Sequence, residues 1–211
     1  MKKLIAILMI AAAFGLYSQK NMGAIKAGMF FPQACDGGFD LGLEYGFHID
    51  TNLDVGVSLD WFKKEFKDKD YIGEVEQYDN TVVGTQYRDL GEITIYDFPV
   101  MVAVTAKFPL GDKLKWFATG GLGAEMLYAS MKAYDSNDGS EIDTKEESTL
   151  AFDFNWRLGG GVMFNLGQRS EIFGEIAYHY SKPSFEDENG ITTEYDMSGI
   201  MSRVGVRFFI R

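Results

Sequence analysis

The feature that most constrains the fold of this chain is a period of two in side-chain polarity. Residues 149–166 place apolar side chains at even positions, such as Phe152 and Phe154, and polar or very small side chains at odd positions, such as Asp153 and Asn155. Successive side chains of a strand point to opposite faces. The pattern therefore predicts a β-strand with one apolar and one polar face.

The same alternation recurs along the chain and predicts an all-β protein. The expected strands are residues 23–31, 38–48, 52–66, 92–108, 115–133, 149–166, 170–182 and 199–211. These eight segments make an even number, as a closed up-and-down barrel of antiparallel strands requires. We therefore expect an eight-stranded barrel.

The connections between these strands differ in length. The tight turns are "IDTN", "PLGDKL" and "LGQR", and the long links are residues 63–91, 134–148 and 183–198. If the strands run up and down, the tight turns share one end and the long links the other, with the short "PQACDG" link as the exception. This asymmetry predicts a transmembrane β-barrel with short periplasmic turns and long extracellular loops.

Alternation alone does not say whether the apolar face contacts lipid or encloses a ligand, because a soluble lipocalin-like carrier has the same period. The polar face is the more informative one. It carries the glycines Gly28, Gly42, Gly46, Gly56, Gly121, Gly123, Gly159, Gly161 and Gly205. It also carries the charged residues Lys26, Asp40, Glu44, Asp54, Asp60, Asp97, Lys107, Glu125, Asp153, Arg157, Glu175, Arg203 and Arg207. Small residues relieve crowding inside a narrow barrel, and opposite charges can pair across it.

The apolar face carries aromatic residues near the expected strand ends, as in the girdles at membrane interfaces. They are Tyr45, Trp61, Tyr96, Trp116, Tyr128, Trp156, Tyr178 and Tyr180. We therefore predict that lipid lies outside and a polar core lies inside. An eight-stranded barrel is filled by its own side chains, so a large pore is not expected.

The first residues, "MKKLIAILMIAAAFGLYSQ", place two lysines before a short apolar run. This is the layout of a signal peptide, which we assign to residues 1–19, with the barrel domain at residues 20–211. The only cysteine, Cys35, excludes a disulfide within one chain. The formal net charge of -11 repels phosphate backbones, so we expect no nucleic-acid partner.

Three stretches carry a family resemblance. They are "GGFDLGLEYGFHIDTNLDVGVSLDWF", "ITIYDFPVMVAVTAKF" and "DMSGIMSRVGVRFFIR". The chain resembles the eight-stranded outer-membrane β-barrel proteins that are abundant in Bacteroidetes and related Gram-negative bacteria. The resemblance covers essentially the whole chain after the signal, and it implies a monomer in the outer membrane, in contact with lipid and lipopolysaccharide. Its motifs are architectural and imply no activity.

One segment raises the alternative of catalysis. The "HYS" stretch places His179 two residues before Ser181, with acids at Glu186, Glu188 and Glu194 further on. It is similar to the His-x-Ser pair of outer-membrane lipid A deacylases, in which the pair faces the membrane. Here both residues share parity with Glu175 and are expected to face the lumen, with His179 bonded to Glu175 or a neighbour. We therefore predict no enzyme activity and no catalytic or cofactor residues, with a deacylase and a soluble lipocalin-like carrier as the alternatives.

The long links are acidic. The segment "YDSNDGSEID" supplies Asp135, Asn137, Asp138, Glu141 and Asp143, and the other links supply Glu74, Glu76, Asp79, Glu146, Glu147, Glu186, Asp187 and Glu188. The spacing in "YDSNDGSEID" does not match a calcium-binding EF-hand loop, and we predict no dedicated metal site. As a hypothesis, the acidic tips contact the phosphates of lipopolysaccharide through divalent cations, or repel anionic surfaces.

Overall fold

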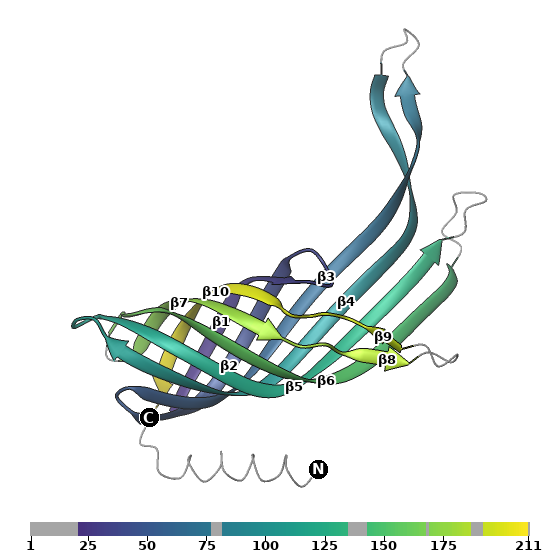
Figure 1. Ribbon diagram of the computed structural model, residues 1–211. Coiled ribbons are helices and arrows are strands. Elements are labelled where there is room, and N and C mark those ends of the chain that lie inside the picture. The colour runs from purple at the N-terminus through teal and green to yellow at the C-terminus, as the bar shows by residue number, and fades with distance from the viewer. Residues whose placement is uncertain (1–20, 77–81, 135–142, 168, 187–191, 211) are drawn as a thin grey trace.

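The computed structural model describes residues 21–76, 82–134, 143–167, 169–186 and 192–210. Within them, eight antiparallel strands form a closed barrel, and β10 pairs with β1 to close it (Figure 1). The barrel strands are β1 (Asn21–Pro32), β2 (Gly38–Asp50), β3 (Leu53–Glu76), β4 (Val82–Pro109), β5 (Leu114–Tyr134), β6 (Asp143–Asn165), β7 (Ser170–Tyr180) and β10 (Gly199–Ile210). The predicted fold class is confirmed.

A small two-stranded sheet lies between β7 and β10 in the sequence. It pairs β8 (Ser184–Glu186) with β9 (Thr192–Glu194). Within the described part of the chain, no helix is long and apolar enough to cross a membrane.

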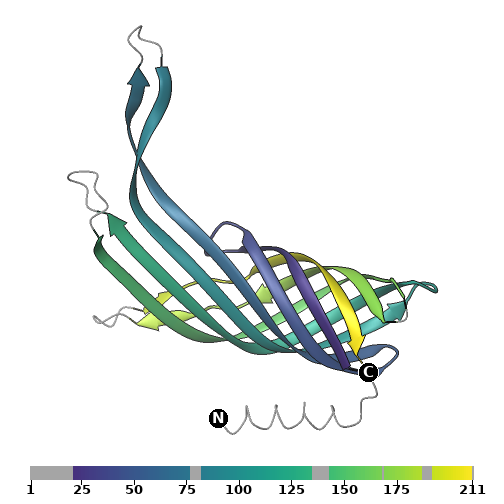
Figure 2. The same ribbon diagram turned by 180° about the vertical axis from the view of Figure 1, so that it is seen from behind.

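The predicted long link at residues 63–91 is mostly strand, which corrects that expectation. β2 pairs with β3 only as far as Lys63, whereas β3 and β4 continue to pair from Lys63–Tyr96 to Glu76–Val82. The hairpin therefore leaves the barrel wall, as Figures 1 and 2 show. Alternation did not reveal it, because "KKEFKDKD" carries charge at consecutive positions. Outside the barrel there is no contrast between lipid and lumen to impose a period of two.

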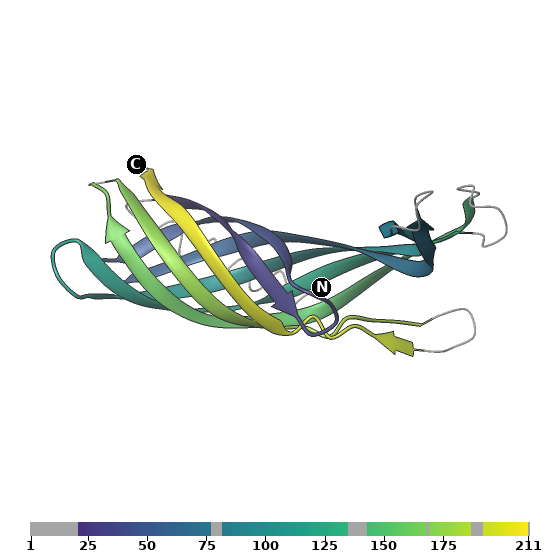
Figure 3. The same cartoon turned by 90° about the horizontal axis from the view of Figure 1, so that it is seen from above.

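The predicted link at residues 134–148 is also shorter than expected, because β6 begins at Asp143. β5 and β6 pair from Leu114–Phe164 to Tyr134–Asp143, but β6 and β7 pair only as far as Trp156–Tyr180. The β3–β4, β5–β6 and β8–β9 hairpins leave the same end of the barrel (Figure 3). We call this end the hairpin end, and the opposite end, with the three tight turns, the turn end.

The apolar face of the strands points outward. Phe152, Ile176 and Val204 remain 69%, 66% and 65% exposed. Rings pack against each other toward both ends: Trp156 stacks on Tyr180 at a centroid distance of 5.4 Å, and Phe108 stacks on Trp116 at 4.1 Å. A soluble carrier would need the reverse arrangement, with an apolar interior and a polar outer face.

Candidate functional site in the barrel lumen

The lumen is filled by layers of side chains. Near the turn end, an apolar group consists of Ala24, Phe117, Met163 and Phe173. Charged residues fill the middle of the barrel, and a second apolar group closes the hairpin end. We call this second group the apolar cap; its buried members are Phe30, Phe62, Ile95, Leu127, Ala151, Met197 and Met201. The order is visible along β5, where Phe117, Glu125 and Leu127 face inward in succession.

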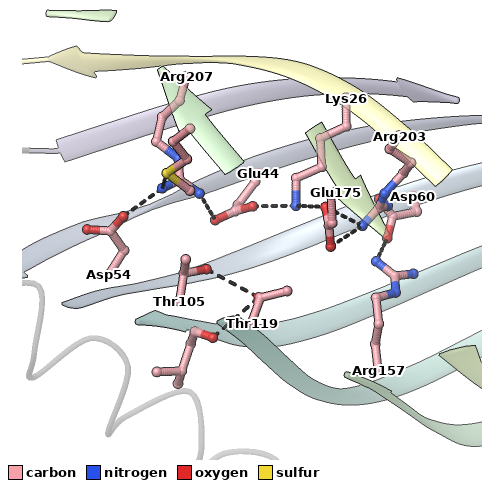
Figure 4. Close-up of polar contacts among 12 residues, drawn as sticks. Lys26, Glu44, Asp54, Asp60, Thr105, Thr119, Arg157, Glu175, Arg203 and Arg207 are labelled. Atoms are coloured by element: carbon pink, nitrogen blue, oxygen red, sulfur yellow. Dashed lines mark hydrogen bonds and ion pairs between the residues drawn. The ribbon is translucent and has the colours of Figure 1, made fainter. Parts of the chain in front are cut away.

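The charged middle is organised around Arg203 of β10 (Figure 4). Its Nη2 lies 3.1 Å from both carboxylate oxygens of Glu175, and its Nη1 lies 3.0 Å from Oδ1 of Asp60. The second carboxylate oxygen of Asp60 accepts a hydrogen bond from Arg157 at 2.5 Å. Asp40 lies 3.5 Å from Arg203. Glu175 lies on β7, which neighbours β10, so its contact with Arg203 runs along the barrel wall. Asp60 lies on β3, which two strands separate from β10 and two others from β6, so its contacts with the two arginines cross the barrel.

The charged contacts continue toward the turn end. Nη1 of Arg207 donates to Asp54 at 2.7 Å, and Nζ of Lys107 donates to the other oxygen of the same carboxylate at 2.9 Å. Lys26 lies 2.5 Å from Glu44, which also lies 3.6 Å from Arg207. We call the whole set the ion-pair network; it consists of Lys26, Asp40, Glu44, His48, Asp54, Asp60, Lys107, Arg157, Glu175, Arg203 and Arg207, with His48 bound to Asp54. It confirms the prediction that lumenal acids and bases share contacts.

The ion-pair network leaves little open space. A cavity of about 10 Å³ lies among Lys26, Ser58, Met101, Arg157 and Glu175, which is about the volume that one water molecule needs. The glycines contribute to this packing: a Cβ on Gly42 would collide with the Asp60 carboxylate.

A second charged group lies between the ion-pair network and the apolar cap. Asp97 of β4, Glu125 of β5 and His179 of β7 are buried, and one ligand atom from each lies within 4.8 Å of the others. Nε2 of His179 lies 2.8 Å from Oε2 of Glu125, and Nδ2 of Asn155 on β6 lies 3.5 Å from the same oxygen. We call these four residues the acidic cluster. Four consecutive strands contribute to it.

The acidic cluster differs from the ion-pair network because, among the described residues, neither of its carboxylates forms an ion pair with an arginine or a lysine. Among the described residues, both carboxylate oxygens of Asp97 have no hydrogen-bond partner, and the same holds for Oε1 of Glu125, Oδ1 of Asn155 and Nδ1 of His179. Asp97 is 0% exposed. The residues follow from the sequence, since each was expected to face the lumen or lies in phase with residues that were. That they lie at the same height in the barrel does not follow from the sequence, because it depends on the stagger between the strands.

The structure places His179 and Ser181 inside the barrel, as their parity predicted. Both are 0% exposed, and the His179 ring contacts Phe30 edge to face at 5.6 Å. The partner of His179 is Glu125 rather than Glu175, which is bound to Arg203. Ser181 Oγ has no hydrogen-bond partner among the described residues, and His179 is therefore not hydrogen-bonded to it.

Of the acids considered with that pair, Glu194 contacts Lys182 at 3.1 Å. Lys182 also lies 3.3 Å from Asp196. The hydrogen bond to Glu194 and, to a smaller extent, that to Asp196 raise the pKa of Lys182. Burial acts to raise the pKa of Asp196, but hydrogen bonds from Ser198 and Lys182 outweigh it and hold this pKa below its ordinary value. These residues lie beyond the end of β7, outside the barrel wall.

The remaining acidic residues of the predicted loops lie wholly or partly outside the description. Asp79, Asp135, Asn137, Asp138, Glu141, Asp187 and Glu188 are outside the described residues. Glu74, Glu76, Asp143, Glu146, Glu147 and Glu186 lie on described strands, but their side chains are not described. Residues 1–20, which contain the expected signal peptide, are also outside the described residues.

Comparison with known proteins gives one family. The model of the outer membrane protein beta-barrel domain matches residues 8–208. No curated protein sequence matches the chain.

Solved structures share the fold at low sequence identity. A major outer membrane protein from Thermus thermophilus aligns with a TM-score of 0.56 and 13% identity, covering 90% of this chain and 99% of that one. Ail, the attachment invasion locus protein of Yersinia pestis, aligns with a TM-score of 0.51 and 13% identity over 90% and 97% of the two chains. Neisserial surface protein A aligns with a TM-score of 0.51 and 11% identity over 90% and 95%.

Proposed function

The chain belongs to the outer membrane protein beta-barrel domain family, and from that premise we propose that it acts at the cell surface through its acidic hairpins, without catalysis and without a large pore. It lies in the outer membrane of a Gram-negative bacterium, in contact with lipid and lipopolysaccharide. The turn end is then periplasmic and the hairpin end extracellular. We further propose that residues 1–19 are removed as a signal peptide and that the barrel is a monomer.

The observation that carries this proposal is a closed lumen below projecting hairpins. The ion-pair network crosses the barrel, and the apolar cap covers it at the extracellular end. A solute would have to break buried ion pairs to pass, so the described lumen favours a plug over a channel. The hairpins, in contrast, extend the sheet beyond the barrel on the extracellular side (Figure 3).

The composition of the extracellular segments suggests their ligand. Residues 131–148 contain six acids and two bases, and residues 183–198 contain five acids and no base. Lipopolysaccharide carries phosphate groups, which such segments repel unless divalent cations bridge the two sets of anions. We therefore propose a cation-dependent contact with the phosphates of lipopolysaccharide.

The absence of catalysis is supported by the position of the histidine and serine pair. A lipid-modifying barrel must present its nucleophile to the lipid, whereas His179 and Ser181 are buried on the lumenal side. The base is already bound to Glu125, and Phe30 packs against its ring.

The test is binding of the detergent-solubilised protein to immobilised lipopolysaccharide, measured by surface plasmon resonance in Mg²⁺ and again in EDTA. We expect binding in Mg²⁺ that falls at least about tenfold in EDTA, since bridging needs the cation. Replacing Glu186, Asp187 and Glu188 by Gln, Asn and Gln should weaken binding. The matched control replaces Asp50 and Asp112, at the periplasmic turns, by Asn and should leave binding unchanged.

A second variant tests the long hairpin. Because Lys69 pairs with Asp89, residues 70–88 can be replaced by Asn-Gly, which closes a two-residue hairpin turn in the existing register. The variant should retain the gel shift on boiling that marks a folded barrel. If binding to lipopolysaccharide is the same with and without EDTA, and the same in all of these variants, the proposed surface role is overturned. A steady single-channel conductance in a planar bilayer would overturn the closed lumen.

A further inference from the structure

We propose that Asp97, Glu125 and His179 bind one divalent transition-metal ion, of the Zn²⁺ class, inside the barrel. The three ligand atoms lie within 4.8 Å of one another, and each residue comes from a different strand. Carboxylate oxygens and an imidazole nitrogen are ligands that zinc uses in proteins. The proposal does not depend on the surface role of the hairpins.

The unpartnered atoms of the acidic cluster point to a missing positive partner. Buried carboxylate oxygens are normally hydrogen-bonded, yet neither oxygen of Asp97 has a partner among the described residues. Oε1 of Glu125 and Oδ1 of Asn155 are also without one, and both residues are buried. Asn155 is not an acid, so this is an observation separate from the clustering of carboxylates. Four atoms from one small region thus lack a donor.

The charges of the neighbouring residues lead to the same conclusion. The nearest cation, Arg157, pairs in register with His179 but binds Asp60 through Nη1, and its Nε and Nη2 have no hydrogen-bond partner among the described residues. Arg203 is bound to Asp60 and Glu175. Among the described residues, neither arginine forms an ion pair with Asp97 or Glu125, and above the cluster the cap is apolar. A divalent ion would balance the charges of Asp97 and Glu125.

The ligand set favours a transition metal over calcium. Calcium takes six to eight oxygen ligands, whereas this cluster offers two carboxylates, one amide and an imidazole. Imidazole suits zinc and its neighbours, and three protein ligands leave the fourth position of a tetrahedral ion for a water molecule. Binding through Nε2 of His179 would replace its contact with Glu125, and Asn155 would orient that carboxylate.

The position of the site predicts what the metal does. Asp97, Glu125 and His179 lie on β4, β5 and β7, so one ion would tie together a run of four strands that includes β6. Phe30, Phe62 and Met197 cover the site from the extracellular side. We therefore expect the ion to enter while the barrel folds, to exchange slowly afterwards, and to raise the temperature at which the folded band is lost.

The experiment uses the untagged chain without residues 1–19, because a histidine tag would bind metal itself. The protein is refolded in detergent with EDTA or with ZnCl₂, passed over a desalting column, and analysed for zinc by mass spectrometry. We expect roughly one zinc per folded chain and a higher melting temperature after refolding with zinc. Retention of no zinc, or of zinc without any effect on melting, would overturn the proposal.

Matched variants locate the ion. His179→Gln and Asp97→Asn should each lower zinc retention at least about tenfold, as expected for loss of a ligand. His48→Gln removes the other histidine of the chain, which contacts Asp54 in the ion-pair network, and should leave retention unchanged. Retention lost only in His48→Gln would overturn the assignment.

A measurement on the wild-type protein tests the proposal even if the variants do not fold. Refolding with Co²⁺ in place of zinc should give visible absorption bands of a four-coordinate ion with a nitrogen ligand. Weak bands of a fully hydrated ion would overturn the site. The metal site is rejected if the wild-type protein retains neither zinc nor cobalt and Asp97→Asn is as stable in EDTA as in zinc. The carboxylates of Asp97 and Glu125 would then share a proton instead.

Discussion

The ion-pair network and the acidic cluster are both buried in the same lumen, but only the network pairs its acids with arginine and lysine. In the ion-pair network each carboxylate lies against at least one arginine or lysine, and Arg203 joins three acids. In the acidic cluster two carboxylates lie beside a histidine and an asparagine, and several of their oxygens have no donor among the described residues. Burial is thus not what separates the two regions.

The difference shows that a crowded polar lumen is not one uniform plug. A network of buried ion pairs resists removal of any member, because each deletion leaves an opposite charge without its partner. A cluster with excess negative charge should instead gain from losing a carboxylate, unless a cation completes it. Stability measurements on single variants can therefore distinguish the two regions.

The largest effect is expected from breaking the centre of the ion-pair network. Arg203→Met leaves Asp60, Glu175 and Asp40 without their shared cation and should lower the free energy of unfolding by about 3–5 kcal/mol. Urea unfolding in detergent micelles measures it. The control Lys63→Met breaks an exposed ion pair with Glu65 outside the network and should cost about 1 kcal/mol or less. Equal losses would mean that the network contributes no more to stability than an exposed ion pair.

Removing a charge from the acidic cluster should have an effect whose sign depends on metal. In protein refolded with EDTA, Asp97→Asn removes a buried carboxylate that has no donor among the described residues and should raise the free energy of unfolding by roughly 1–3 kcal/mol. In protein refolded with zinc, the same change removes a ligand and should lower it. Unfolding curves under both conditions give the comparison. A loss of stability under both conditions would show that Asp97 belongs with the ion-pair network.

Packing around the ion-pair network can be tested without changing charge. Gly42→Ala places a Cβ against Oδ1 of Asp60, which accepts from Arg203, and overpacking of this kind costs about 1–3 kcal/mol. Gly174→Ala is the control, since a Cβ there meets no atom within 4 Å, and it should stay within about 0.5 kcal/mol of wild type. Similar losses in both would indicate that backbone propensity, rather than the network, sets the effect.

The smallest effect is expected from the exposed ion pairs of Lys182 with Glu194 and Asp196. The pKa of Asp196 is lowered below 3.8 in the folded protein, so its contribution is present above that value and is lost as the pH falls. The pKa of Lys182 is raised above 10.5, so its contribution is present below that value and is lost as the pH rises. Limited proteolysis near β8 and β9 should therefore be slowest between about pH 3.8 and pH 10.5. A flat pH profile would contradict this.

Much of the fold could be predicted from the sequence. Alternation located all eight barrel strands, and twelve of the thirteen charged residues assigned to the lumen are buried, Asp153 being half-buried. The extension of β3 and β4 beyond the barrel was missed, because charged residues at consecutive positions hide a strand that has no lipid-facing side. Pro99 interrupts the pairing of β4 with β3 between Leu59–Val100 and Phe62–Asp97, and no periodicity signals this.

The candidate site was less accessible from sequence. Parity showed that His179 faces the lumen, but the expected partner was Glu175, four residues away on the same strand, or a neighbour of it. The actual partner, Glu125, is 54 residues distant. The same limit applies to the metal site that we propose, because no short spacing in the sequence unites Asp97, Glu125 and His179.

By itself the sequence determined which side of the barrel wall each residue faces, because a strand has a side-chain period of two whatever its partners are. Only the tertiary structure decided which residues share a height inside the lumen. That height depends on the stagger between neighbouring strands and on closure of β10 onto β1. The inward direction of Asp97, Glu125 and His179 is therefore a property of the chain, and their proximity is a property of the closed barrel.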